Sequence, residues 1–160
     1  MENLLLKIIE RNTRLTLEEL AAMTGATPDA VAEQLDEYRR AGIIHGTRTL
    51  IDWEKVGGNG VHAMIEVRVS PKKDHGFDEI AEMIANIEEV DSVWLMSGGY
   101  DLLLAISGAT FQEVAMFVSR RLSPLDDVLS TATHFVLRTY KKDGAQYLSN
   151  NTDEREIPAL

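Results

Sequence analysis

Residues 57–60, GGNG, divide the chain into two parts whose apolar residues recur with different periods. Before this stretch the apolar residues recur at intervals of three and four, which is the period of an amphipathic helix. After it they first alternate one by one, which is the period of a strand with one buried face. Because glycine imposes little backbone preference, the stretch predicts a flexible joint. The sequence therefore predicts two domains, residues 1–56 and 61–145, with a hinge at 57–60 and a polar tail at 146–160.

Capping signals in the first part predict two short helices that meet at a tight turn. Thr16 and Glu19 form a capping box, in which each side chain accepts a hydrogen bond from the other residue's backbone. Gly25 ends this helix, because glycine adopts the left-handed C-terminal conformation at low cost. Thr27 as the N-cap and Pro28 at the first helical position start the next helix. Two helices joined by a short turn that contains glycine match the helix-turn-helix pattern, with a plain packing hairpin as the alternative.

Residues on both sides of this pair complete the predicted domain. The apolar run at residues 4–9 predicts an earlier helix, and Gly42 ends the last one. The β-branched residues in 47–52 predict an extended segment or wing, and thus a winged helix-turn-helix. The residues expected on the inward faces of the second and third helices are Leu17, Leu20, Ala21, Val31, Leu35 and Tyr38.

The second part predicts an α+β domain with the order βαββαβ. Strands are expected at 61–69, 90–96, 102–107 and 128–140, and helices around 77–84 and 111–122. Thr110 and Glu113 predict a second capping box, and Phe111 is expected on the inward face of the helix that follows. This order implies a ferredoxin-like sheet with both helices on one face. Because the other face is not cleanly polar, a second copy of the chain is expected to cover it.

Residues 97–101, SGGYD, connect the second and third predicted strands. Two adjacent glycines expose backbone N–H groups that side chains would otherwise cover. The simplest interpretation is a hairpin turn in which Asp101 binds its own backbone.

The helix-turn-helix, the glycine joint and the βαββαβ domain with a Gly-x-x-Asp turn together resemble the Lrp/AsnC family of bacterial and archaeal transcription regulators. The resemblance covers residues 1 to about 144. It rests on Ala21, Gly25 and Val31, on 41–44 (AGII), on 98–101 (GGYD) and on 129–133 (LSTAT). It implies that the second domain senses an amino acid, dimerises through its sheet and assembles further into rings, often octamers. The effector would lie between dimers, against the SGGYD turn.

The chemistry of a free amino acid fits that implied site. The N–H groups of Gly98 and Gly99 can hold a carboxylate, and Asp101 can pair with an ammonium group. Further hydroxyl groups for the effector are offered by Ser97, Tyr100, Thr131 and Thr133.

The charge of the chain fits DNA binding less well. The formal net charge is −10, and residues 1–60 hold seven Lys or Arg against ten Asp or Glu. The outward face of the third predicted helix carries Asp29, Glu33 and Asp36, which DNA repels unless one accepts a hydrogen bond from cytosine N4. Modest affinity per domain, raised by multivalency, is therefore expected. The candidate contacts to double-stranded DNA are Thr27, Pro28, Gln34, Arg39, Arg40 and Arg48.

Other functional classes have weaker support in the sequence. The chain has no cysteine and no apolar stretch of membrane-spanning length, and a cytoplasmic protein is expected. His62 and His134 fall on neighbouring predicted strands, but two histidines without a third ligand make a poor zinc site. Nucleotide-binding and nucleophile motifs are missing, so no enzyme activity, catalytic residue or cofactor is expected. Two alternatives stay open: a tetrapyrrole (sirohaem) decarboxylase of the same architecture, and a ligand-sensing adaptor that has lost DNA binding.

Overall fold

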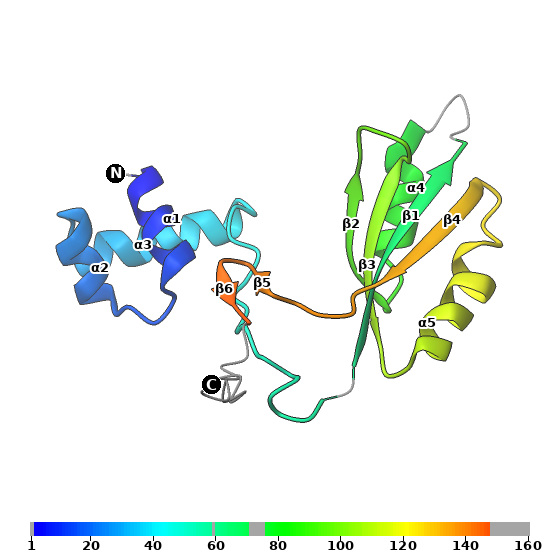
Figure 1. Cartoon of the computed structure of the whole chain (residues 1–160). Helices are drawn as coiled ribbons and strands as arrows, with labels where there is room; N and C mark the ends of the chain where they lie inside the picture. The colour runs from blue at the N-terminus through cyan, green and yellow to red at the C-terminus, as the bar shows by residue number, and fades with distance from the viewer. Residues whose placement is uncertain (1, 59, 71–75, 148–160) are drawn as a thin grey trace, which may run out of the picture. The chain divides into compact units, whose positions relative to one another are not determined.

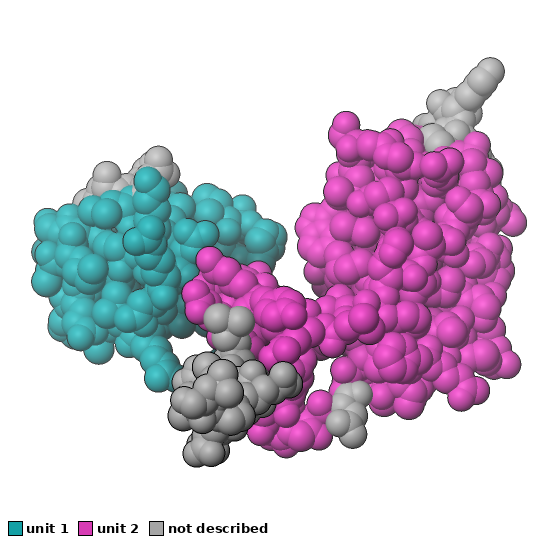
Figure 2. Space-filling model, viewed as in Figure 1, with its two compact units in different colours: residues 1–50 teal, residues 51–160 magenta. Residues whose placement is uncertain are grey.

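The computed structural model describes residues 2–58, 60–70 and 76–147 (Figure 1). The chain forms two compact units, residues 1–50 and residues 51–160 (Figure 2). No helix within the described ranges is long and apolar enough to cross a membrane.

The first unit consists of α1 (Glu2–Arg11), α2 (Leu17–Thr24) and α3 (Pro28–Arg40). Their buried side chains form one small core, made of Leu5, Leu20, Ala21, Val31, Leu35 and Tyr38. The predicted inward face is therefore confirmed except at Leu17, which is 38% exposed because α2 makes its buried contacts one turn later.

The predicted ends of α2 and α3 are confirmed in atomic detail. The Thr16 hydroxyl accepts from the Glu19 N–H at 3.3 Å, and the Glu19 carboxylate accepts from the Thr16 N–H at 2.8 Å. Gly25 adopts a φ of 70° at the end of α2, which favours glycine. The Thr27 hydroxyl accepts from the Ala30 N–H at 3.3 Å. The turn between α2 and α3 is thus specified by local hydrogen bonds and by one glycine.

We expect Thr16→Ala to lower the free energy of unfolding by about 1 kcal/mol, because it leaves an α2 N–H without its acceptor. Thermal unfolding measures the loss, and Thr13→Ala is the control because its hydroxyl makes no hydrogen bond with the described residues. Equal effects of the two substitutions would contradict a capping role.

The pKa of Glu18, also in the first turn of α2, is lowered by hydrogen bonds from the backbone amide of Glu18 and from the side chain of Thr16. The stability that this lowered pKa contributes is present above the pKa of Glu18 in the unfolded chain. It is lost as the pH falls through the pKa of Glu18 in the folded chain.

The expected wing does not form as a β-structure. Residues 47–52 contain no strand, and no ladder pairs them with another described segment. Residues 47–52 were expected to form either an extended segment or a wing, and the expectation of a β-wing is therefore wrong. The three β-branched residues of this segment, Thr47, Thr49 and Ile51, favour a strand only where a partner strand supplies hydrogen bonds.

The second unit contains the predicted ferredoxin-like arrangement. Its sheet has the order β2-β3-β1-β4, and every neighbouring pair is antiparallel. The strands are β1 (Val61–Val69), β2 (Val90–Leu95), β3 (Leu102–Gly108) and β4 (Val128–Phe135). The helices are α4 (Gly76–Ala85), α5 (Phe111–Phe117) and a π-helical continuation, η1 (Val118–Leu122). One face of β1 and β3 packs with these helices into a single core, so both helices cover the same face (Figure 1).

Two expectations about this unit are wrong, and a third is only half confirmed. The last strand ends at Phe135 rather than at residue 140, and a separate hairpin follows, β5 (Lys141–Lys142) with β6 (Ala145–Gln146). Phe111 is 56% exposed and packs edge-to-face on Phe135 with the ring centroids 4.8 Å apart. Phe117, six residues later on the same helix, takes the buried position instead. The capping box is half confirmed: the Thr110 hydroxyl accepts from the Glu113 N–H at 3.1 Å, but the Glu113 carboxylate accepts from the Ala109 N–H at 2.7 Å instead of the Thr110 N–H.

Candidate functional site

The SGGYD stretch forms the connection between β2 and β3, as predicted. The Met96 N–H donates to the Asp101 carbonyl at 2.8 Å and closes the loop. Gly98 and Gly99 are both exposed, and a Cβ atom placed on either would meet no atom within 4 Å. Packing within one chain therefore does not require glycine at Gly99. The backbone of this loop is open to a ligand or to another chain.

Asp101 is tied to the neighbouring strand rather than to its own backbone, which corrects the simplest interpretation from the sequence. Its Oδ2 atom accepts from the Val69 N–H at 2.9 Å, and its N–H donates to the Val67 carbonyl at 3.0 Å. The side chain is half-buried, and its Oδ1 atom accepts no hydrogen bond from the described residues. One carboxylate oxygen thus orients Asp101, which leaves the other for an ammonium group.

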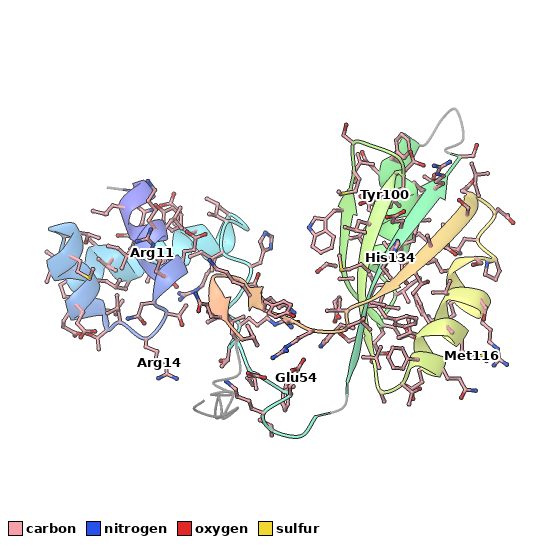
Figure 3. The ribbon with its side chains drawn as sticks, viewed as in Figure 1. Arg11, Arg14, Glu54, Tyr100, Met116 and His134 are labelled. Carbon is pink, nitrogen blue, oxygen red and sulfur yellow. The ribbon has the colours of Figure 1, made fainter. Side chains whose placement is uncertain are left out.

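The remaining candidate effector residues are less closely grouped. Ser97 is exposed, and Tyr100 is half-buried (Figure 3). Thr131 and Thr133 alternate with exposed residues on β4 and are half-buried on the helix-covered face. Val67 pairs with both Leu102 and Thr131, so β1 separates Thr131 from β3 by two strand spacings, about 10 Å. Within one chain, the structure brings Asp101 beside the glycines and leaves the two threonines apart.

The face of the sheet opposite the helices is largely open and partly apolar. Trp94 is 45% exposed and lies opposite Leu103 in the β2–β3 ladder. Leu103 in turn lies opposite Glu66 on β1. The half-buried side chains of Met64 and Ala105 lie on the same face, because they alternate with buried residues along their strands. This open sheet face offers a surface that a second copy could cover.

The histidines of this face contact different partners and do not meet. His62 Nδ1 lies 2.9 Å from the Ser107 hydroxyl, which donates to Asp91. His134 Nε2 lies 3.3 Å from the Glu66 carboxylate. Among the described residues, no group of three or more His, Cys, Asp or Glu side chains could hold a metal ion.

The candidate DNA surface on α3 carries cations that are already engaged. Arg39 forms an ion pair with Asp36 at 2.7 Å, and Arg40 donates to the Asp36 carbonyl at 3.4 Å. Gln34 donates to the Glu37 carboxylate at 3.1 Å. A phosphate or base that contacts these side chains must therefore replace contacts within the helix.

Other candidate DNA contacts lie at the two ends of α3 and beyond it. Thr27 and Pro28 are exposed at its start, and Arg48 is exposed in the segment that follows it. Asp29 and Glu33 are exposed on the outward face, as the helical spacing predicts. The surface is thus accessible but mostly acidic.

The β5–β6 hairpin is the element that the sequence interpretation missed. Asp143 and Gly144 have φ values of 48° and 81°, and two successive positive φ values are typical of a type I′ hairpin turn. The signal was present, because Asp-Gly between short polar segments is a strong local indication of such a turn. Five β-branched residues spread over 128–140 favoured the expectation of one continuous strand.

A helix-turn-helix unit joined to a ferredoxin-like domain with an open β2–β3 loop defines a two-domain DNA-binding and ligand-sensing class of protein. Residues 62–146 match the model of the Lrp/AsnC ligand binding domain. The chain is 45% identical over 157 residues to YugG of Bacillus subtilis, described as an uncharacterized HTH-type transcriptional regulator, and the match covers 98% of this chain and 95% of YugG. The chain belongs to the Lrp/AsnC family.

Solved structures of related proteins have the same fold. The leucine response regulatory protein of Mycobacterium tuberculosis aligns with a TM-score of 0.75 at 22% identity, covering 89% of this chain and 94% of that chain. A transcriptional regulator of Neisseria meningitidis, solved as a complex with L-Met, aligns with a TM-score of 0.69 at 26% identity. That alignment covers 88% of this chain and 90% of that chain.

Proposed function

We propose that this protein is a transcriptional regulator that binds duplex DNA through its first unit and an amino acid through its second. The observation that carries the proposal is the α2–Gly25–α3 motif, capped as a helix-turn-helix, in a chain 45% identical to an HTH-type regulator. The hinge is proposed at residues 57–60. Because the proposed partner is duplex DNA, the protein is proposed to act in the cytoplasm.

The proposed effector site is the open β2–β3 loop. Gly98 and Gly99 offer N–H groups to the carboxylate of an amino acid, and the second oxygen of Asp101 faces its ammonium group. The L-Met complex of the Neisseria meningitidis protein supports this class of ligand for a relative. Ser97 and Tyr100 would contribute hydroxyl contacts, and Thr131 and Thr133 would do so only through another copy of the chain.

The open sheet face is the proposed dimer interface. A two-fold dimer would present two α3 helices to successive major-groove turns, about 34 Å apart. Two such contacts raise the affinity above that of one acidic helix by multivalency. Further assembly of dimers into a ring such as an octamer would place β2–β3 loops from different dimers together.

The test is a gel shift with duplex fragments from the gene's own upstream region, with and without each of the twenty amino acids, paired with calorimetry. The proposal expects a retarded band at low salt and one amino acid that changes both the band and the measured heat. The acidic face of α3 favours one alternative, a sensor without DNA binding. That alternative expects amino-acid binding and no retarded fragment even at low salt.

Arg39→Gln is expected to weaken binding on all DNA sequences and to reduce the slope of log affinity against log salt by about one, if Arg39 leaves Asp36 for a phosphate. Arg120→Gln is the control, because Arg120 is exposed on η1 of the other unit and its substitution changes the net charge by the same amount. Fluorescence anisotropy across a salt series measures both slopes. The same slope for Arg39→Gln as for the wild type would remove Arg39 from the interface.

A further inference from the structure

We propose that the β5–β6 hairpin is a second DNA-contact element, which holds phosphates of the duplex backbone through Lys141 and Lys142. The proposal rests on the DNA-binding function proposed above. It names a site outside the helix-turn-helix unit, on a segment that follows the last strand of the ferredoxin-like sheet.

The charge of this hairpin differs from that of the rest of the chain. Residues 136–147 hold three cations and one carboxylate, in a protein whose net charge is −10. Lys141 and Lys142 are exposed and form no ion pair with the described residues. By contrast, Arg39 of α3 is paired with Asp36 at 2.7 Å. The hairpin therefore offers a polyanion two cations without a carboxylate partner among the described residues, whereas Arg39 of α3 must first leave Asp36.

The position of the hairpin in the second unit also favours a contact with DNA. β4 ends beside the start of β1, because Phe135 pairs with Ala63 and the Val136 N–H donates to the His62 carbonyl at 2.8 Å. Val61 is the residue at which the chain enters this sheet from residues 1–50. The hairpin thus leaves the sheet at the end where the DNA-binding unit is tethered. The connecting residues 136–140 can span at most about 17 Å.

The shape of the hairpin suits a nucleic-acid groove. Lys141 pairs with Gln146 and Lys142 with Ala145, so the element is a two-stranded ribbon closed by the Asp143-Gly144 turn. A two-stranded β-ribbon fits the major groove of B-DNA, where phosphates flank it on both sides. Adjacent residues of a strand point to opposite faces, so the two long lysine side chains leave the ribbon on different sides and can reach separate phosphates. These features favour duplex DNA over a flat anionic surface.

The test compares the double variant Lys141→Gln/Lys142→Gln with the wild-type full chain on one duplex, by anisotropy over a salt series. We expect the slope of log affinity against log salt to fall by about 1.8 for each bound subunit, since each phosphate contact contributes about 0.9. The matched control is Lys72→Gln/Lys73→Gln, which removes the same charge from the segment after β1. Light scattering on all three proteins checks that the oligomeric state is the same.

The outcomes separate this proposal from the one on which it rests. A reduced slope in the Lys141/Lys142 variant alone supports the hairpin contact. An unchanged slope, or an equal reduction in the control, overturns it and leaves DNA binding by α3 intact. No duplex binding by the wild type overturns both proposals. If the variant binds DNA as the wild type does but loses binding to vesicles that contain an anionic lipid, the hairpin is a membrane contact and the DNA proposal is wrong.

Discussion

Leu104→Ala is expected to lower the free energy of unfolding of the second unit by about 2–5 kcal/mol. Leu104 is 0% exposed in the middle of β3, and it lies opposite Ile65, which is also 0% exposed. Removing three carbons there leaves a cavity in a core that both helices share with the sheet. Because a domain of this kind is stable by about 5–15 kcal/mol in total, the loss is large. Urea denaturation followed by circular dichroism measures it.

The adjacent residue provides the control for that effect. Leu103 is half-buried on the open sheet face, opposite Trp94 and Glu66. Leu103→Glu places a second carboxylate beside Glu66 and makes the proposed dimer interface polar, so we expect loss of the dimer in sedimentation experiments. The fold of each chain is expected to persist in the far-ultraviolet spectrum. A Leu103→Glu protein with the wild-type mass in solution would contradict the proposed interface. All samples need equal protein concentration, because dimer stability depends on it.

Asp101→Asn is expected to weaken effector binding by about 30-fold or more, while the chain stays folded. The asparagine carbonyl oxygen can still accept the Val69 N–H, which lies 2.9 Å from Oδ2 of Asp101. The negative charge that would face the ammonium group of an amino acid is lost, and removing one member of such a charge pair costs about 2–5 kcal/mol. Calorimetry with the amino acid found in the screen measures the change. Wild-type affinity in this variant would exclude Asp101 as the ammonium ligand.

Two further variants separate the structural role of Asp101 from its role in binding. Asp101→Ala removes the acceptor of the Val69 N–H as well, and we expect an additional loss of about 1–3 kcal/mol in the free energy of unfolding. Gly99→Ala is expected to leave stability nearly unchanged, because its Cβ would meet no atom within 4 Å. It should nevertheless weaken binding, since the methyl group partly covers the N–H groups of the loop. Full binding by Gly99→Ala would place the carboxylate elsewhere.

Much of the fold could be predicted from the sequence because its signals are local. The capping box at Thr16 and the left-handed Gly25 involve residues three or four positions apart, and both are confirmed. The alternation in β1 predicted its bounds, Val61–Val69, because one face of that strand is buried against the helices. The errors arose where local preference is weak evidence. Phe111 is apolar and correctly spaced for the core, but Phe117 occupies the space beneath the sheet.

The candidate site was predictable in chemistry and less so in geometry. The adjacent glycines and Asp101 identify an open loop with N–H donors and one carboxylate, and the structure has that loop between β2 and β3. The hydrogen bond from Val69 to Asp101 joins residues 32 positions apart, so no local pattern contains it. The ion pair between Arg39 and Asp36 was accessible from their spacing of three along a helix.

The sequence by itself determined approximately where the helices begin and end, where the helical period changes to alternation, and which residues are candidates for binding an amino acid. These features depend on neighbouring residues, whose geometry the backbone conformation sets directly. Only the tertiary structure decided which side chains share a face, which oxygen of Asp101 remains available, and that the chain turns back at Asp143-Gly144 to form a basic hairpin separate from the four-stranded sheet. These features depend on contacts between residues that are distant in the sequence. Each hydrogen bond between strands requires a partner that the local sequence does not specify.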